Sequence, residues 1–289
     1  MNLEEIDTIV ISGGGVKILS FLGSIKYIFK NTKMNRKQIK NYIGTSAGAI
    51  LSFYLILNYT LEEIETIFLN LDIATFDVKY DIDKLFTNLG MIKENVFTNI
   101  FKHTLEYKLG LTDITFIDLY NITNLNITIT ISNISDQKIE YWNHLTTPNN
   151  SVIDALTITS NIPLLFEPYK DNKTNKYYLD GSIVDHYPMS QVKDINKFIG
   201  ICNIVIDDEK NINNMIENDE EFKLFKYIYK ILYFSTNKNL TYPQEYLNRT
   251  IIIQNEKNNT PLLIDFNMSI KDRKKCIEYG YDITANFFN

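Results

Sequence analysis

The feature that most constrains this chain is a Gly-Thr-Ser-Ala-Gly run at residues 44–48, which lies between two apolar segments. Residues 42–43 are predicted to end a strand, and residues 47–58 are apolar on nearly every side, as is typical of a buried helix. Small residues around Ser46 permit the sharp strand-to-helix turn of a nucleophile elbow, which exposes the serine hydroxyl. The run alone is a moderate signal, because a tight turn without catalysis also needs small residues.

A second glycine cluster, at residues 13–15, also lies between a predicted strand and a predicted helix. The β-branched residues 8–11 are predicted to form a buried strand before it, and residues 16–30 show helical apolar spacing after it. Two units of strand, glycine turn and helix predict an α/β fold with a parallel or mixed sheet and helices on both faces.

The rest of the chain continues the mixture of helices and strands, without an internal repeat or a dividing linker. We therefore expect a single domain over residues 1–289, with the motifs within residues 8–206 and an extension at 207–289. Helical segments at 61–71 and 81–109 are predicted to form a cap beside the active face. The other predicted elements are helices at 152–160, 222–234 and 269–287, strands at 125–134, 138–142, 177–179, 198–206 and 250–254, and an exposed loop at 207–221.

The glycine cluster admits three interpretations. A dinucleotide-binding loop would need a glycine where Ile18 stands, and a phosphate-binding P-loop would need Gly-Lys-Ser/Thr at its end, which is absent. An oxyanion hole fits best, because glycines let backbone amides approach a ligand closely. Lys17, in the first turn of the helix, either approaches an anionic group or is solvated. The expected oxyanion donors are the amides of Gly13, Gly14, Gly15 and Ala47.

A serine nucleophile needs a base, and Asp180 is the first candidate. It ends a predicted strand and is followed by Gly181, although an Asp-Gly turn is common by itself. His186 offers a rival, since Ser46, Asp180 and His186 follow the order of the α/β-hydrolase triad. His186 stands only six positions after Asp180, which is unusually close for the acid and the histidine of such a triad.

With these elements in this order, the chain resembles the patatin-like phospholipase family over roughly residues 9–206. Residues 12–17 resemble the family's glycine-rich oxyanion loop, 44–48 its nucleophile elbow, and 180–182, with Pro188 behind them, its Asp-Gly segment. Residues 160–163, Ser-Asn-Ile-Pro, resemble a stretch that precedes this aspartate. The resemblance implies a three-layer α/β/α fold and a lipid acyl hydrolase, with a Ser46–Asp180 dyad, no histidine, and neither metal nor cofactor.

The chain departs from the family pattern at three places, none of which removes a catalytic group. Ile18 replaces a glycine after the basic residue, Ser182 is the third residue of the Asp segment, and residues 185–187 lack the asparagine common before Pro188. The residues that would support the motifs are Lys17, Gly44, Gly48 and Gly181.

Composition limits the setting in which the protein works. The net charge of −6 argues against a nucleic-acid partner, and two cysteines are too few for a disulfide scaffold. The N-terminus lacks a signal-peptide pattern and the longest apolar stretch is too short to span a bilayer, so we expect a cytoplasmic protein, peripheral to membranes at most.

Residues 222–234 interleave lysines with aromatic residues, which fits either a helix that docks on anionic lipid or, more commonly, an ordinary surface helix.

Three functions remain open. The first is a lipid acyl hydrolase, of phospholipase A or lysophospholipase type, that acts on phospholipids or other acyl lipids. The second is an acyltransferase that forms the same acyl-enzyme with Ser46 but passes the acyl group to an acceptor other than water. The third is a non-catalytic lipid-binding module, against which the presence of both Ser46 and Asp180 argues.

Overall fold

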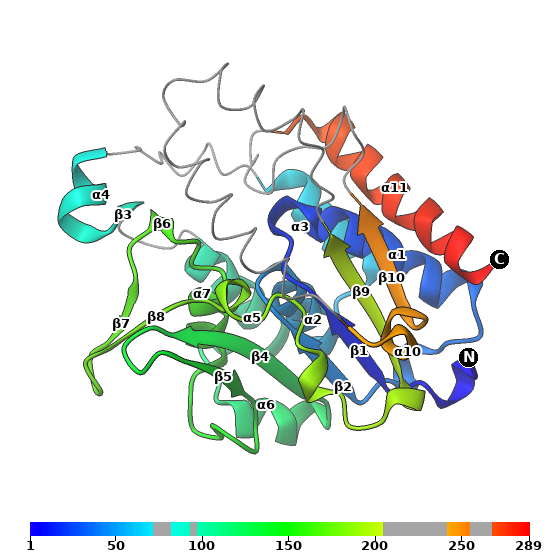
Figure 1. Cartoon of the computed structure of the whole chain (residues 1–289), viewed down its shortest axis with the longest axis horizontal. Coiled ribbons are helices and arrows are strands. Elements are labelled where there is room, and N and C mark those ends of the chain that lie inside the picture. Colours follow the sequence, from blue (N-terminus) through cyan, green and yellow to red (C-terminus); the bar gives the residue numbers. More distant parts are fainter. Residues whose placement is uncertain (72–81, 93–96, 205–241, 255–267) are drawn as a thin grey trace.

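A computed structural model covers the chain and describes residues 1–71, 82–92, 97–204, 242–254 and 268–289. Its centre is a mixed sheet with helices on both sides (Figure 1). Five parallel strands in the order β10-β9-β1-β2-β4 form most of the sheet, and β8, β7 and β5 add antiparallel pairs at the β4 side. The strands are β1 Thr8–Ile11, β2 Asn41–Gly44, β4 Asn126–Asn133, β5 Lys138–Trp142, β7 Tyr169–Asp171, β8 Lys176–Asp180, β9 Phe198–Ile204 and β10 Thr250–Gln254.

The helices gather mainly on one face of this sheet. There they enclose the larger hydrophobic core, which includes Ile9 and Ile11 of β1. Val10 points to the opposite face, where a smaller core is covered by residues 187–198 and α10. The helices are α1 Ile18–Asn31, α2 Ala47–Ile56, α3 Leu61–Asn70, α4 Ile82–Asn88, α5 Phe97–Leu109, α6 Phe116–Thr123, α7 Val152–Thr159, α10 Gln244–Leu247 and α11 Ile270–Phe288.

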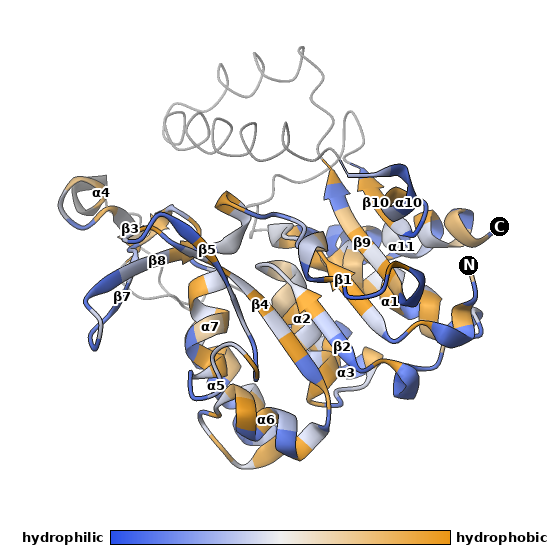
Figure 2. Ribbon diagram, turned by 60° about the horizontal axis from the view of Figure 1, so that its bottom comes forward, coloured by the Kyte–Doolittle hydropathy of each residue, from blue (hydrophilic) through white to orange (hydrophobic). Residues whose placement is uncertain are grey.

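Strands β1 and β9 are largely apolar because both of their faces are covered, whereas β4 alternates isoleucines with polar residues (Figure 2). Helix α2 is likewise buried on nearly every side, as the sequence predicts. Within the described ranges, no helix combines the length and the apolar character needed to cross a bilayer.

The C-terminal helix α11 packs along α1 and so joins the last part of the chain to the glycine-rich N-terminal unit (Figure 1). The two helices approach closely at Gly280, where an added Cβ would lie 1.9 Å from the carbonyl oxygen of Ser20. Ser24 Oγ also donates a hydrogen bond to the carbonyl oxygen of Gly280 at 3.2 Å. This contact fixes the middle of α11 against α1, and the first turn of α11 reaches the pocket described below.

The structure corrects one predicted helix and adds elements that the sequence analysis missed. Residues 81–109 do not form one helix: α4 and α5 are separated by strand β3, Gly90–Ile92, which pairs in parallel with β6, Leu164–Phe166. A partner more than 70 positions away leaves no local pattern. Strand β7 and helix α6 were also missed, and the predicted loop and helix at 207–234 lie outside the described residues.

Candidate active site

Ser46 occupies a sharp turn between strand β2 and helix α2. Its backbone has φ 50° and ψ −119°, a conformation that residues other than glycine rarely adopt. The turn closes against the sheet so tightly that a Cβ on Gly48 would lie 2.2 Å from the carbonyl oxygen of Ile11. The small residues of the run are thus required by contact as well as by the turn, and together they produce the geometry of a nucleophile elbow.

The sheet register brings Asp180 to Ser46 across 134 positions of sequence. Gly44 pairs with Ile129 of β4, and two residues further along β4, Ile131 pairs with Asp180 at the end of β8. Ser46, two residues beyond Gly44, therefore lies at the level of the carboxylate. Its Oγ donates a hydrogen bond to Asp180 Oδ2 at 2.7 Å, and the Ser182 N–H donates to the other carboxylate oxygen at 2.8 Å.

The carboxyl group of Asp180 is buried, with 4% of the residue exposed. Burial disfavours the charged form and raises the pKa of Asp180 to about 6, while hydrogen bonds from Ser182 and Ser46 act in the opposite direction. Both donors are neutral groups. The result is a carboxylate that is charged at neutral pH yet binds a proton far more strongly than an ordinary aspartate does.

Thr159 and Thr130, which were not predicted as site residues, support the elbow through hydrogen bonds. Thr159, the last residue of α7, accepts the N–H of Ser46 at 2.9 Å through its Oγ1 and donates to the carbonyl oxygen of Thr130 at 2.8 Å. Thr45 Oγ1 donates to the hydroxyl of Thr130 at 2.9 Å. The only signal in the sequence was the position of Thr159 directly before the Ser-Asn-Ile-Pro stretch. This position does not indicate that its side chain contacts Ser46 and Thr130.

The glycine loop lies beside Ser46 because β1 and β2 are neighbours and each turn follows the end of its strand. Gly15, with φ 50°, borders the pocket together with Ala47, the first residue of α2. No acceptor among the described residues takes the N–H of Gly14, Gly15 or Ala47. Gly13 differs from this expectation: its N–H donates to the carbonyl oxygen of His186 at 2.9 Å, so it is not directed at the site.

Lys17 is not a solvated lysine. Only 1% of it is exposed, and its ammonium lies close enough to Cys276 of α11 to lower the pKa of that thiol, although burial raises the same pKa more. Ile18, which stands where the glycine-rich loop of the resembled family has a glycine, begins α1 and lines the pocket. The departure from the pattern therefore adds an apolar side chain to the pocket wall.

His186 lies near the glycine loop but does not bridge Ser46 and Asp180. Its Nε2 is 3.1 Å from the carbonyl oxygen of Asn203, whereas the Ser46 hydroxyl reaches the carboxylate directly. Burial lowers the pKa of His186 to about 4, which keeps the ring neutral at pH 7. Over the residues that the structure describes, no group of three or more His, Cys, Asp or Glu side chains is placed to hold a metal ion.

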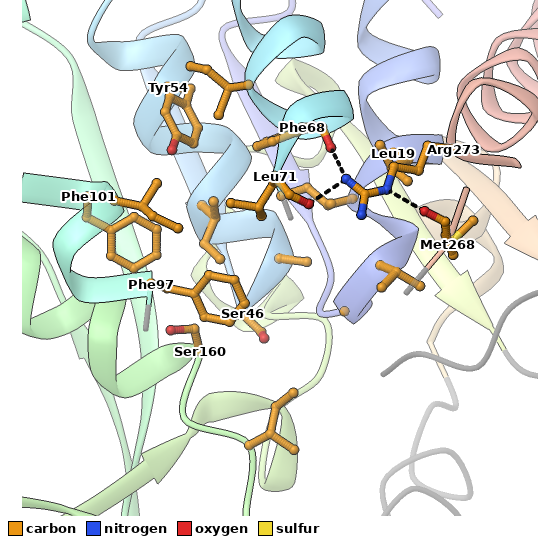
Figure 3. A pocket seen from close by; sticks show the side chains of 18 residues that line it. Leu19, Ser46, Tyr54, Phe68, Leu71, Phe97, Phe101, Ser160, Met268 and Arg273 are labelled. Atoms are coloured by element: carbon orange, nitrogen blue, oxygen red, sulfur yellow. Dashed lines mark hydrogen bonds between the residues drawn. The ribbon is translucent and has the colours of Figure 1, made fainter. Parts of the chain in front are cut away.

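An apolar pocket opens on the other side of Ser46 (Figure 3). Ser46, Gly15, Ala47 and Ser160 border it, and α1, α2, α3 and α5 all contribute apolar side chains to its wall. The predicted cap segments thus contribute directly to the pocket. The principal wall residues are Ile50 and Tyr54 of α2, Ile67 and Phe68 of α3, and Phe97 and Phe101 of α5.

Arg273 of α11 closes the opposite side of the pocket, away from Tyr54 and Phe101 (Figure 3). Its Nε donates to the carbonyl oxygen of Met268 at 3.1 Å, and its Nη1 donates to that of Leu69 at 3.0 Å. Further bonds reach the carbonyls of Phe68 and Leu71, so the guanidinium satisfies the C-terminal carbonyls of α3. This role in the structure was not predicted from the sequence.

Comparison with known proteins places these features in context. A family model described as patatin-like phospholipase matches residues 9–193. The probable lipid hydrolase 463L of Invertebrate iridescent virus 6 is 30% identical in an alignment of 194 residues, which covers 63% of this chain and 61% of that protein. The uncharacterized protein R571 of Acanthamoeba polyphaga mimivirus is 24% identical over 283 residues, or 96% of this chain and 92% of that protein.

Two solved structures share the fold at low sequence identity. The crystal structure of VipD from Legionella pneumophila has a TM-score of 0.60 at 18% identity and is matched over 98% of this chain and 66% of that one. A chain of the heterodimeric ExoU–SpcU complex from Pseudomonas aeruginosa has a TM-score of 0.56 at 15% identity, over 99% of this chain and 51% of that one. The chain thus spans less than two thirds of the iridescent virus relative and of both these structures.

Proposed function

The chain belongs to the patatin-like phospholipase family, and on that premise we propose that it hydrolyses carboxylic esters of membrane lipids, with Ser46 as nucleophile and Asp180 as its direct base. The observation that carries the proposal is the 2.7 Å hydrogen bond from Ser46 Oγ to Asp180 Oδ2 beside an apolar pocket. The name of the iridescent virus relative, a probable lipid hydrolase, agrees with it.

In the first step, Ser46 Oγ forms a bond to the ester carbonyl carbon while its proton passes to Asp180 Oδ2. The carbonyl oxygen becomes an oxyanion, for which the amides of Gly14, Gly15 and Ala47 are the proposed donors. The tetrahedral intermediate then expels the alcohol, which takes the proton back from Asp180. Water attacks the acyl-enzyme in the same way, with Asp180 again accepting and returning the proton.

The environment of Asp180 supports its role as a base. An exposed aspartate is a weak base for an alcohol, but burial raises the pKa of Asp180 from 3.8 to about 6. A base works best when its pKa lies near the working pH, because it is then both deprotonated and strongly proton-binding. The carboxylate is also held by the Ser182 N–H, so it needs no rearrangement to accept the proton.

Release of fatty acid from a panel of diacyl phospholipids, lysophospholipids and triacylglycerols tests the proposal. We expect Ser46→Ala to lower the rate at least about 10³-fold and to abolish labelling by a fluorophosphonate. Ser160→Ala is the matched control, because Ser160 also borders the pocket but its Oγ donates to the carbonyls of Leu156 and Thr157 in its own helix. Hydrolysis that survives Ser46→Ala at the unmodified rate would contradict the assignment.

The same assay separates hydrolysis from acyl transfer. We expect free fatty acid as the main product even when lysophospholipid or glycerol is added as acceptor. A new acyl ester that replaces the fatty acid would instead identify an acyltransferase with the same nucleophile. Folded protein that neither hydrolyses any lipid nor reacts with a fluorophosphonate would favour a lipid-binding module.

A further inference from the structure

The pocket follows one face of α2, the helix that begins directly after Ser46. Its α2 wall consists of Ala47, Ile50 and Tyr54, whose spacing of three and four residues places them on a single stripe. No later residue of α2 borders the pocket. On the facing helix α5, the lining also stops early, at Phe101. An acyl chain attached to Ser46 therefore has an apolar path along α2 that ends at Tyr54.

Tyr54 forms a stiff end to this path because aromatic rings support it on several sides. Its ring meets the rings of Tyr59 and Phe68 edge-on, with centroids 5.4 and 5.6 Å away, and only 1% of the residue is exposed. Phe53 packs against both Tyr54 and Phe101. Closely packed rings of this kind do not move aside without loss of contacts elsewhere in the core.

The opposite end of the pocket is less suited to an alkyl chain. There the apolar side chains of Leu19 and Met268 share the wall with the charged guanidinium of Arg273, which is held by the backbone carbonyls of Met268 and α3. An alkyl chain placed against a guanidinium and carbonyls gains less from leaving water than one placed against aromatic rings. Figure 3 shows Tyr54 and Phe101 on one side of the pocket and Met268 with Arg273 on the other.

We propose that Tyr54 limits the length of the acyl group and that this protein prefers medium-chain acyl esters; the assignment rests on the proposed hydrolase activity of Ser46. Tyr54 lies eight positions after Ser46 along α2, which corresponds to about 12 Å along the axis. An extended chain advances roughly 1.2 Å per bond, so this distance accommodates about eight to ten carbons. The tilt of helical side chains toward the N-terminus places the Tyr54 ring toward the shorter limit.

The test is the dependence of kcat/KM on chain length for p-nitrophenyl esters from acetate to palmitate. Wild type is expected to be fastest with octanoate or decanoate. Ile50→Trp fills the middle of the stripe, so it should lower kcat/KM for octanoate at least about tenfold while leaving acetate within about threefold. Met268→Trp is the matched control at the Arg273 end and should leave the profile unchanged.

Tyr54→Leu provides the opposite change, since a smaller residue should move the optimum toward myristate. If that variant does not fold, Ile50→Trp and Met268→Trp decide the question. A profile that shifts with Met268→Trp but not with Ile50→Trp overturns the assignment, because the chain then lies toward Arg273. A wild-type rate that still rises from decanoate to palmitate overturns it as well.

Binding distinguishes failure of this assignment from failure of the proposed function. Calorimetric titration of Ser46→Ala with saturated fatty acids from hexanoate to palmitate should show affinity that rises to about decanoate and then levels or falls, and Ile50→Trp should remove the rise. If fatty acids bind in this pattern but no ester is hydrolysed, the proposed hydrolase activity is contradicted and the limit on chain length is supported. Rapid hydrolysis with equal affinity for all chains would contradict only the limit.

Discussion

The two sides of Ser46 are built in opposite ways. Toward Asp180 and Thr159 the serine meets only polar groups, and both its hydroxyl and its N–H are hydrogen-bonded at 2.7 and 2.9 Å. Toward α2, α3 and α5 it borders a pocket whose walls are almost entirely aliphatic and aromatic. One side is closely paired, and the other leaves space for a ligand.

This difference teaches which changes each side tolerates. A buried polar group that loses its partner costs about 1–3 kcal/mol, so the polar side accepts few substitutions. An apolar wall tolerates a change of shape more readily, since hydrophobic side chains substitute for one another at moderate cost. We therefore expect substitutions on the polar side to change the rate for every ester, and those on the apolar side to change which ester is preferred.

The largest effect is expected from Asp180→Asn, which retains the size of the side chain but removes the proposed base. Fatty acid release should fall about 10³–10⁴-fold, since an amide cannot accept the Ser46 proton. The free energy of unfolding, in contrast, should increase in this variant. The pKa of Asp180 is about 6 in the folded chain against 3.8 for an ordinary aspartate, so the ionised group disfavours the folded state by up to about 3 kcal/mol at pH 8.

Urea unfolding of wild type and Asp180→Asn at several pH values checks this second part. Because the folded-state pKa is raised, protonation stabilises the folded wild type, and that stabilisation is lost as pH rises from about 4 through about 6. The variant should thus have the higher free energy of unfolding at pH 8, with the difference shrinking below about pH 6. A variant that is less stable than wild type at pH 8 would show that burial of the ionised Asp180 carboxylate does not destabilise the folded state.

Thr159→Val is expected to have the next largest effect, because it removes the acceptor of the Ser46 N–H while retaining the side-chain shape. We expect kcat to fall about 10–10²-fold with little change in KM, since the strained elbow would lose its support. Thr159→Ser should restore most of the rate. Thr157→Val on the same helix, whose hydroxyl pairs with Thr98, serves as the control and should remain active.

A smaller, graded effect is expected from pH. Below about pH 6, where Asp180 becomes protonated, kcat/KM should fall about tenfold per pH unit. Rates of fluorophosphonate labelling should follow the same curve, because they report the nucleophile without a lipid surface. A rate that stays constant down to pH 4 would be incompatible with Asp180 as the base.

The smallest effect is expected from His186→Asn. The ring pairs with the carbonyl oxygen of Asn203 rather than with Ser46, so kcat/KM should change less than about fivefold once the folded fraction is matched by circular dichroism. Near-complete loss of hydrolysis in a folded variant would restore the triad that includes this histidine. In that case the polar side of Ser46 would need His186 as well as Asp180 for the proposed reaction.

Much of the fold was predictable because its signals are local. The strand, glycine turn and helix units around residues 13–15 and 44–48 and most later elements appear as predicted. The helix predicted over 81–109 was wrong, because β3 exists only through its pairing with β6. The sequence also marked Ser46, Asp180 and the loop glycines as candidates, but it did not distinguish Gly13, whose amide is engaged by His186, from Gly15.

By itself, the sequence determined which residues were able to form an elbow, a glycine loop and an acidic strand end, since these depend on the size and chemistry of neighbouring side chains. Only the tertiary structure decided which of them meet. The register of β2, β4 and β8 brings Ser46 to Asp180, and the packing of α7 brings Thr159 behind the elbow. Pairing between strands and the closure of a pocket by residues of α1, α2, α3, α5 and α11 depend on contacts between distant residues, which no local pattern records.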